Sequence, residues 1–201
     1  NTINAYNLLK NSDIQGLLDI IPSYTSILIT YDIFLYKYSE LCEIIKNYLN
    51  NHSKTMNNHN SKLVRIPVYY GCDVGLDLQR VASLHQLDVN SVISVHTAYT
   101  YTVFAIGFAP GFAYCGEVNE KIATPRLETP RKIVAKGSVA IANNQTAVYP
   151  SNSPGGWNIL GKTTFEMFDK KIDTLCPVKV GDKIQFIPIT KERFINDGGL
   201  I

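Results

Sequence analysis

Residues 139–149 have the sequence VAIANNQTAVY, and this stretch decides the fold of the second half of the chain. Two runs of small and β-branched residues, 139–142 and 146–149, flank Asn143 and Asn144. Asparagine tolerates a positive φ angle better than most residues do. The pattern therefore predicts a tight β-hairpin.

Short strands separated by glycine and proline continue on both sides of this hairpin. Residues 101–108 are apolar on both faces apart from Thr102, as expected of a strand that is buried on both sides. Residues 184–187 form another candidate strand, which follows a turn at residues 180–183. Many short strands with few helices are typical of a β-barrel or a β-sandwich, and we expect such a domain over residues 96–201.

Helix and strand alternate in the first half of the chain. The spacing of apolar residues predicts helices within residues 4–18 and from Ser39 onward, whereas residues 25–31 and 64–70 have the composition of strands. Polar residues fill positions 50–62, which we expect to form an exposed loop or linker. The sequence therefore predicts an α+β protein, with a small α/β domain over residues 1–95.

Composition and charge limit the possible partners. The chain has 201 residues, of which 45% are hydrophobic, and its net charge is only +2, with no block of like charges. This argues against nucleic acid and anionic membranes as partners, and no apolar stretch is long enough to cross a bilayer. The four cysteines are scattered and no leader opens the chain, so we expect a cytoplasmic protein with reduced thiols. No His/Cys/Asp cluster has the spacing of metal ligands, and no metal site is predicted.

A series of seven short phrases in the second half resembles a known family. The phrases are GFAPGFAY (107–114), PR (125–126), TPR (129–131), GSVAI (137–141), QTAVYP (145–150), SPGGW (153–157) and GD (181–182). Together with Ile66-Pro67-Val68 and His96, they are similar to the family of the 5-oxoprolinase B subunit, also called the KipI or allophanate hydrolase subunit 1 family. The order of the phrases makes the resemblance specific, and it covers nearly the whole chain.

The resemblance implies a two-domain fold and a role in a complex. It implies a small ferredoxin-like α/β domain followed by a cyclophilin-like β-barrel. It also implies a pairing with the KipA-like C subunit and with the A subunit, and an ATP-dependent conversion of 5-oxoproline to glutamate, with ATP bound by the complex and not necessarily by this chain. Two alternatives remain open: an inhibitor of a sensor histidine kinase, and the carboxyltransferase part of a biotin-dependent urea carboxylase.

The chain also departs from the family pattern. Family members usually have a strand before the first helix, and without it the small sheet would expose an edge. Cys72 and Cys115 stand where glycine and leucine are usual. Cys115 is therefore a weak candidate for a nucleophile.

Three residues are candidates for catalysis. Arg126 and Arg131 each follow a proline in two copies of Thr-Pro-Arg, and a guanidinium group on a restrained backbone suits a carboxylate such as that of 5-oxoproline. The alternative is that these arginines bridge loops or contact a partner. His96 is a candidate acid or base, although its helical spacing from Val92 and Ile93 also fits a core histidine.

Aromatic residues around bent Gly-Pro segments predict a groove for substrate or partner. Tyrosine and tryptophan combine an apolar ring with a polar group, and glycine lets the backbone approach a ligand closely. The alternative is an ordinary core. The candidate groove residues, which include two polar members that could orient an amide, are Phe108, Phe112, Tyr114, Ser138, Gln145, Tyr149 and Trp157.

Residues 156–163, GWNILGKT, match the Walker A pattern formally. A phosphate-binding loop needs a preceding strand, a following helix and small residues between them. Trp157, Ile159 and Leu160 suit a strand instead. We therefore expect a strand here and no phosphate loop.

Overall fold

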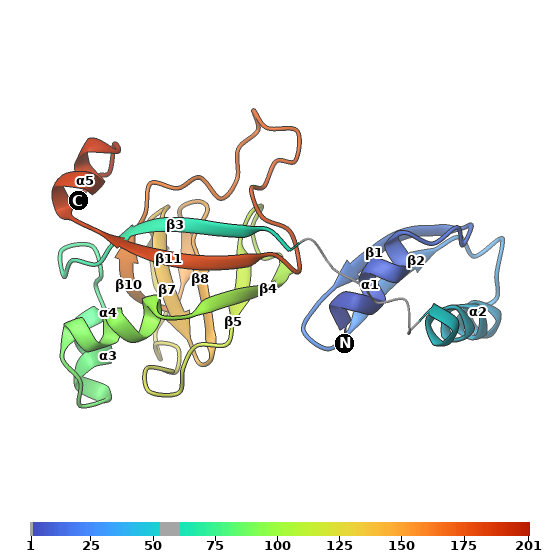
Figure 1. Cartoon of the computed structure of the whole chain (residues 1–201), viewed down its shortest axis with the longest axis horizontal. Coiled ribbons are helices and arrows are strands. Elements are labelled where there is room, and N and C mark those ends of the chain that lie inside the picture. Colours follow the sequence, from blue (N-terminus) through green and yellow to red (C-terminus); the bar gives the residue numbers. More distant parts are fainter. Residues whose placement is uncertain (1, 53–60) are drawn as a thin grey trace. The chain divides into compact units, whose positions relative to one another are not determined.

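A computed structural model describes residues 2–52 and 61–201, and these two ranges belong to two separate compact units (Figure 1). The elements of the first unit are α1 (Thr2–Lys10), β1 (Leu17–Pro22), β2 (Ile27–Tyr31) and α2 (Tyr38–His52). β1 and β2 pair as an antiparallel two-stranded sheet, and α1 packs against β1 and α2. Most of residues 50–62, predicted to be a linker, lie outside the described residues.

The first helix ends earlier than the apolar spacing predicts. Leu17 and Leu18 begin β1 instead of continuing the helix. α1 ends at Lys10, and Gly16, with a φ angle of +78° and no room for a side chain beside Leu35, forms the turn that leads into β1.

The second unit is a closed β-barrel with two small helices at one end. Its elements are β3 (Leu63–Tyr69), α3 (Leu78–Leu84), α4 (Val89–Thr97), β4 (Thr100–Ile106), β5 (Ala113–Gly116), β6 (Arg131–Val134), β7 (Ser138–Ala142), β8 (Gln145–Val148), β9 (Ser153–Gly155), β10 (Asn158–Lys162), β11 (Lys183–Ile189) and α5 (Lys191–Asn196). The strand order around the barrel is β10-β3-β11-β4-β5-β8-β7. β6 and β9 form a separate two-stranded sheet. The predicted α+β class with a β-barrel is thus confirmed.

The hairpin predicted from residues 139–149 is present. β7 and β8 pair antiparallel around Asn143, whose φ angle is +51°. Side chains alternate along β7, so that Val139 and Ile141 join the large core cluster inside the barrel, while Ala140 and Ala142 join a second cluster on its outer face. The small outward side chains leave room there for aromatic rings.

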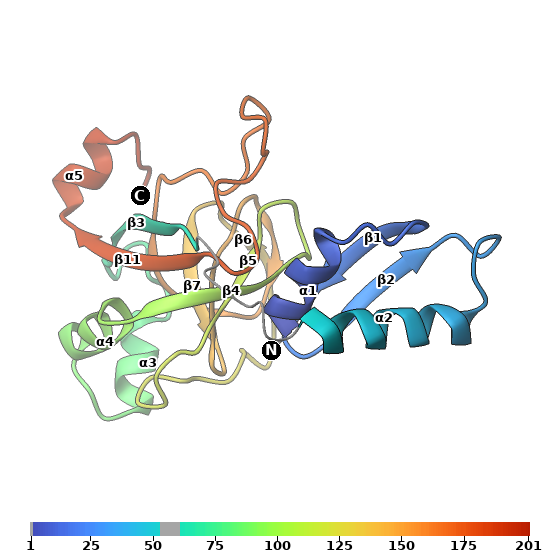
Figure 2. The ribbon, with the colours of Figure 1, turned by 45° about the vertical axis from the view of Figure 1, so that its right-hand side comes forward.

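The boundary between the units differs from the predicted one at residues 95 and 96. Residues 61–95 belong to the barrel unit, because β3 pairs in parallel with β11 along its whole length. In Figure 2, β3, β11 and β4 run side by side across one side of the barrel. α3 and α4 add Leu78, Val81 and Val92 to the barrel core. A pairing between residues so far apart in the chain leaves no local trace in the sequence.

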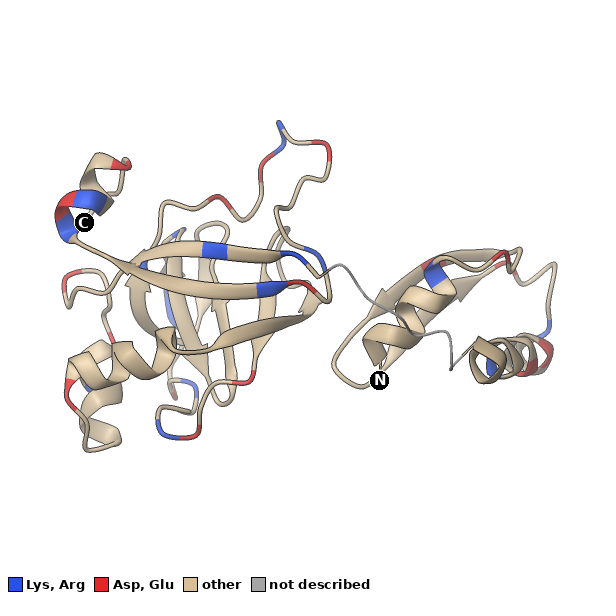
Figure 3. Cartoon of the chain, in the orientation of Figure 1, with Lys and Arg blue, Asp and Glu red and all other residues tan. Residues whose placement is uncertain are grey.

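Lys and Arg residues are distributed over both units and intermixed with Asp and Glu (Figure 3). None of the helices within residues 2–52 and 61–201 has the length and apolar character that spanning a bilayer requires.

Candidate functional site

Seven of the ten predicted site residues meet on the outer face of the barrel, around Phe112. Its ring packs at 5.5 Å from Trp157, 5.2 Å from Tyr149, 4.8 Å from Tyr114 and 5.3 Å from Phe108, measured between ring centroids. We call these five aromatic residues, with two arginines that lie beside them, the aromatic–arginine face. Its members are Phe108, Phe112, Tyr114, Arg126, Arg131, Tyr149 and Trp157.

The aromatic–arginine face is buried at its centre and open at its rim. Phe112 and Trp157 are buried, whereas Phe108 is 64% exposed and Tyr114 is half-buried. Phe108 also has a φ angle of +67°, a backbone conformation that residues other than glycine rarely adopt. A strained, exposed aromatic residue beside a buried aromatic cluster is a feature more typical of binding surfaces than of plain core.

Arg126 lies over the ring of Trp157, with its guanidinium carbon 5.8 Å from the ring centroid. The side chain is exposed, and it forms no ion pair with the part of the chain that the structure describes. A cation–π contact at an exposed site contributes only about 0.5–1 kcal/mol. The guanidinium group is therefore held in place while its donors stay available to an anion.

Arg131 is anchored more firmly than Arg126. Its Nη2 atom donates to Oδ1 of Asp77 at 2.8 Å, and the second carboxylate oxygen of Asp77 accepts the N–H of Ile159 at 2.8 Å. The Nη1 atom of Arg131 is buried and has no hydrogen-bond partner among the described residues. One half of the guanidinium group thus binds Asp77, and the other half has an unused donor.

Two tyrosines of the face remain protonated at neutral pH. Burial raises the pKa of Tyr149 and of Tyr114 above the ordinary value, although the nearby Arg126 opposes both shifts. The main chain of Trp157, beside the hydroxyl of Tyr149, also opposes the rise in the pKa of Tyr149. Gly155 is needed beside this hydroxyl, because a side-chain carbon at position 155 would lie 2.2 Å from it.

His96 lies inside the barrel and not on the aromatic–arginine face. It is completely buried, and its ring stacks on Phe186. The Thr146 hydroxyl donates to the carbonyl of Ala140, so it accepts the Nε2–H of His96 at 2.9 Å, and Nδ1 accepts the Tyr70 hydroxyl at 2.8 Å. Burial lowers the pKa of His96 to about 3. Its predicted role as a proton donor or acceptor to substrate stays a prediction, and its burial opposes it.

Ser138 and Gln145 also lie apart from the face. Ser138 is buried at the start of β7, and Gln145 is half-buried at the start of β8, opposite Ala142. No recorded hydrogen bond or ring contact joins either side chain to the face within the described residues. Their predicted contact with an amide remains untested.

The structure also bears on the Walker A match, on Cys115 as a nucleophile and on metal binding. Residues 158–162 form strand β10 with Ile159 and Leu160 buried, which confirms the strand expected at the Walker A match. The Cys115 thiol is 1% exposed, and burial raises its pKa, so it lacks the thiolate character of a nucleophile. No group of three metal-binding side chains gathers within residues 2–52 and 61–201.

Asp77 is the site residue that the sequence did not reveal. It stands immediately before α3, where an aspartate ordinarily caps the helix, but its side chain makes no capping hydrogen bond. Its carboxylate instead joins β10 to the Thr-Pro-Arg segment that is far away in the chain. The local sequence offers no signal for this role.

Comparisons with known proteins agree with this architecture. The family model described as "Carboxyltransferase domain, subdomain C and D" matches residues 1–178. The 5-oxoprolinase B subunit of Bacillus subtilis (strain 168) is 34% identical over 204 residues, which cover 92% of this chain and 81% of that protein. The protein of the same name from Haemophilus influenzae is 44% identical over 124 residues, 62% of this chain and 58% of that protein.

Solved structures show the same fold. The crystal structure of TTHA0988 has a TM-score of 0.80 at 32% identity; the match covers 94% of this chain but only 36% of that one. The Kluyveromyces lactis urea carboxylase has a TM-score of 0.74 at 18% identity over 98% of this chain and 20% of that one, which shows a shared fold alone. From the family match and the B. subtilis relative, we conclude that this chain belongs to the carboxyltransferase-domain family that includes the B subunit of 5-oxoprolinase.

Proposed function

We propose that this chain works as the B subunit of a multi-subunit, ATP-dependent 5-oxoprolinase, which opens the lactam of 5-oxo-L-proline to give L-glutamate. Membership of the family and the names of its relatives support this reaction. The observation that carries the proposal is the aromatic–arginine face, which has the groups to hold a small anionic amide but is open on one side.

The open side implies that another protein completes the site. Hydrolysis of an activated amide requires a site that controls the access of water. Phe108 and Arg126 are exposed, so this chain does not enclose such a site by itself. In the proposal, the KipA-like C subunit covers the face to form a composite site, and the chain is inactive alone.

Specific roles follow for the residues of the face. The exposed Arg126 would bind the carboxylate of 5-oxoproline, because a guanidinium fork matches a carboxylate. Binding by Arg131 as well would require its buried Nη1 atom to become accessible in the assembled complex. Tyr114, which is half-buried at the rim of the face, would pack against the flat lactam ring, with the buried Trp157 behind it. Asp77 positions Arg131 and does not contact the substrate itself.

ATP belongs to the assembled complex in this proposal. Residues 158–162 form a buried strand with no helix directly after it, so they do not fit a phosphate-binding loop. The ATP site is therefore assigned to the A subunit or the C subunit. ATP would transfer its γ-phosphoryl group to the lactam oxygen and leave as ADP. Water would then attack the activated carbon, and cleavage of the C–N bond with release of phosphate would give glutamate in the cytoplasm, where ATP is available.

Reconstitution tests the proposal. The chain is co-expressed with the A and C subunits, and glutamate release from 5-oxoproline is measured with and without it. We expect turnover to require this chain, and Arg126→Met to reduce it at least tenfold while the matched control Lys132→Met, at an exposed neighbouring site, has little effect. Equal turnover in the absence of the chain would refute the proposal.

The name of the family favours a second candidate, the carboxyltransferase part of a biotin-dependent enzyme. Biotin would then arrive on another chain and enter the same open face. Inhibition of the reconstituted complex by avidin, which sequesters biotin, would favour this candidate over the first.

A further inference from the structure

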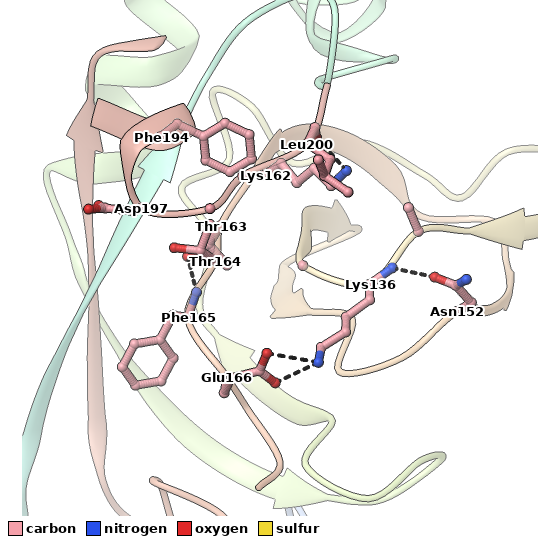
Figure 4. A pocket seen from close by; sticks show the side chains of 14 residues that line it. Lys136, Asn152, Lys162, Thr163, Thr164, Phe165, Glu166, Phe194, Asp197 and Leu200 are labelled. Carbon is pink, nitrogen blue, oxygen red and sulfur yellow. Dashed lines mark hydrogen bonds and ion pairs between the residues drawn. The ribbon is translucent and has the colours of Figure 1, made fainter. Parts of the chain in front are cut away.

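A cavity of about 400 Å³ lies away from the aromatic–arginine face and shares no residue with it. It forms where the turn before β7, the segment after β10 and the C-terminal segment after α5 meet (Figure 4). The residues that shape the argument are Lys136, Lys162, Thr164, Glu166, Phe194 and Leu200.

Close backbone packing builds the walls of this cavity. Gly137 has a φ angle of +80°, and a side chain there would lie 2.2 Å from the carbonyl of Thr163. Gly199 packs against the ring of the buried Phe194, where a side-chain carbon would lie 2.4 Å from the ring. The two segments approach this closely because glycine occupies both positions.

The charges that line the cavity leave one cation uncompensated. Lys136 donates to both oxygens of Glu166, at 2.6 and 2.8 Å, so these two charges cancel. The carboxylate of Asp197 accepts the Nε–H of Arg193 at 3.0 Å. Within the described residues, Lys162 donates only to the neutral carbonyl of Leu200, at 2.8 Å. The lining side chains thus carry two positive and two negative charges, and Lys162 is the one that has no ionic partner among the described residues. Its ammonium group is the charge left for a monoanion.

Donors for an anion lie close to Lys162 in the chain. Neither the main-chain N–H nor the hydroxyl of Thr164 has a hydrogen-bond partner among the described residues. Phe165, Phe194 and Leu200 supply apolar wall on the same cavity. An ammonium group with two neighbouring donors and an apolar wall is suited to a carboxylate that bears a compact, uncharged body.

We propose that this cavity binds a small monocarboxylate, whose carboxylate contacts Lys162 and Thr164 and whose body packs on the accessible side chains of Phe165 and Leu200. Lys162 and Thr163 are the last two residues of the Walker A match, so the proposal gives this part of the sequence a ligand-binding role without a phosphate loop. The proposal that the cavity binds a carboxylate does not depend on the proposed function. Only the choice of 5-oxo-L-proline as one of the probes rests on that function.

Titrations of the isotope-labelled 201-residue chain, followed by nuclear magnetic resonance, test the proposal. The probes are acetate, L-lactate and 5-oxo-L-proline, with the uncharged amide of 5-oxoproline as a control. We expect the amide signals of Gly137, Gly198 and Gly199 to move with at least one carboxylate and not with the uncharged amide. Lys162→Met should weaken this binding at least tenfold, and the matched exposed control Lys179→Met less than twofold.

Thr164→Val provides a second variant that keeps the lysine and should weaken binding in the same direction. Dispersed spectra of each variant establish that it is folded. The proposal is overturned if no carboxylate moves the cavity signals, or if Lys162→Met binds as tightly as the original chain. Movement of Trp157 and Arg126 signals alone would overturn it while leaving the proposed function intact. If a carboxylate binds in the cavity but the reconstituted enzyme turns over without this chain, the cavity proposal is supported and the proposed function is refuted.

Discussion

Replacing Asp77 with alanine removes the anchor of the Thr-Pro-Arg segment. The side chain of Asp77 is 5% exposed, and it accepts hydrogen bonds from Arg131 and from the Ile159 N–H. Removal of one partner of a buried ion pair costs about 3–5 kcal/mol, because the other charge stays buried without compensation. Arg131 is 26% exposed, so water recovers part of this loss, and we expect a destabilisation of about 3 kcal/mol.

Urea denaturation, followed by tryptophan fluorescence, measures this change. Trp157 is the single tryptophan of the chain and is buried in the barrel unit, so its emission reports the unfolding of that unit. With a denaturant slope of about 2 kcal/mol per molar urea, the midpoint should fall by about 1.5 M. Asp77→Asn keeps an acceptor for the Ile159 N–H and should cost roughly half as much.

A double-mutant cycle separates the ion pair from other effects. Arg131→Met and the double variant are measured in the same way, and we expect a coupling energy of about 1.5–3 kcal/mol. Additive effects of the two substitutions, or a midpoint shift below about 0.5 M for Asp77→Ala, would refute the assignment of Asp77 as the anchor.

Three further predictions use other parts of the barrel unit. Because the pKa of His96 is about 3 in the folded state and near 6.5 when unfolded, the unfolded chain binds more protons between these values. Stability should therefore fall by up to about 1.4 kcal/mol per pH unit as the pH drops below 6.5, and His96→Gln should flatten this slope in urea titrations at pH 7 and pH 5. Arg126→Ala should change stability by less than about 1 kcal/mol, yet weaken binding to the C subunit at least tenfold in calorimetry; equal binding would argue against the face as the interface. Gly137→Ala should destabilise the barrel by about 2 kcal/mol or more in thermal melts, because it combines a positive φ angle with a backbone clash, and an unchanged melting temperature would contradict this geometry.

Local patterns predicted the elements that depend on neighbours in the chain. The β7–β8 hairpin follows from Asn143 between two β-prone runs, and β10 follows from buried apolar residues that a phosphate loop would not contain. The rings of Phe112, Tyr149 and Trp157 do cluster, but all three are buried, so the groove expected there stays a prediction beside the alternative of an ordinary core.

Long-range pairings were not predictable in the same way. The placement of β3 in the barrel depends on β11, and the role of Asp77 depends on Arg131. His96 illustrates the ambiguity of a local pattern: its helical spacing fits the core position that it occupies, but residue type alone also suggested chemistry. Only the partners that surround its two nitrogen atoms distinguish these interpretations.

The parallel pairing of β3 with β11 has a consequence for how the chain is made. Synthesis runs from the N-terminus, so residues 63–69 leave the ribosome long before residues 183–189, their partners on one side. Until then β3 keeps one edge unpaired, and the barrel cannot close. Closing so long a loop is entropically costly and makes folding slow, so nascent chains that still lack β11 are the species most exposed to aggregation and most in need of a chaperone.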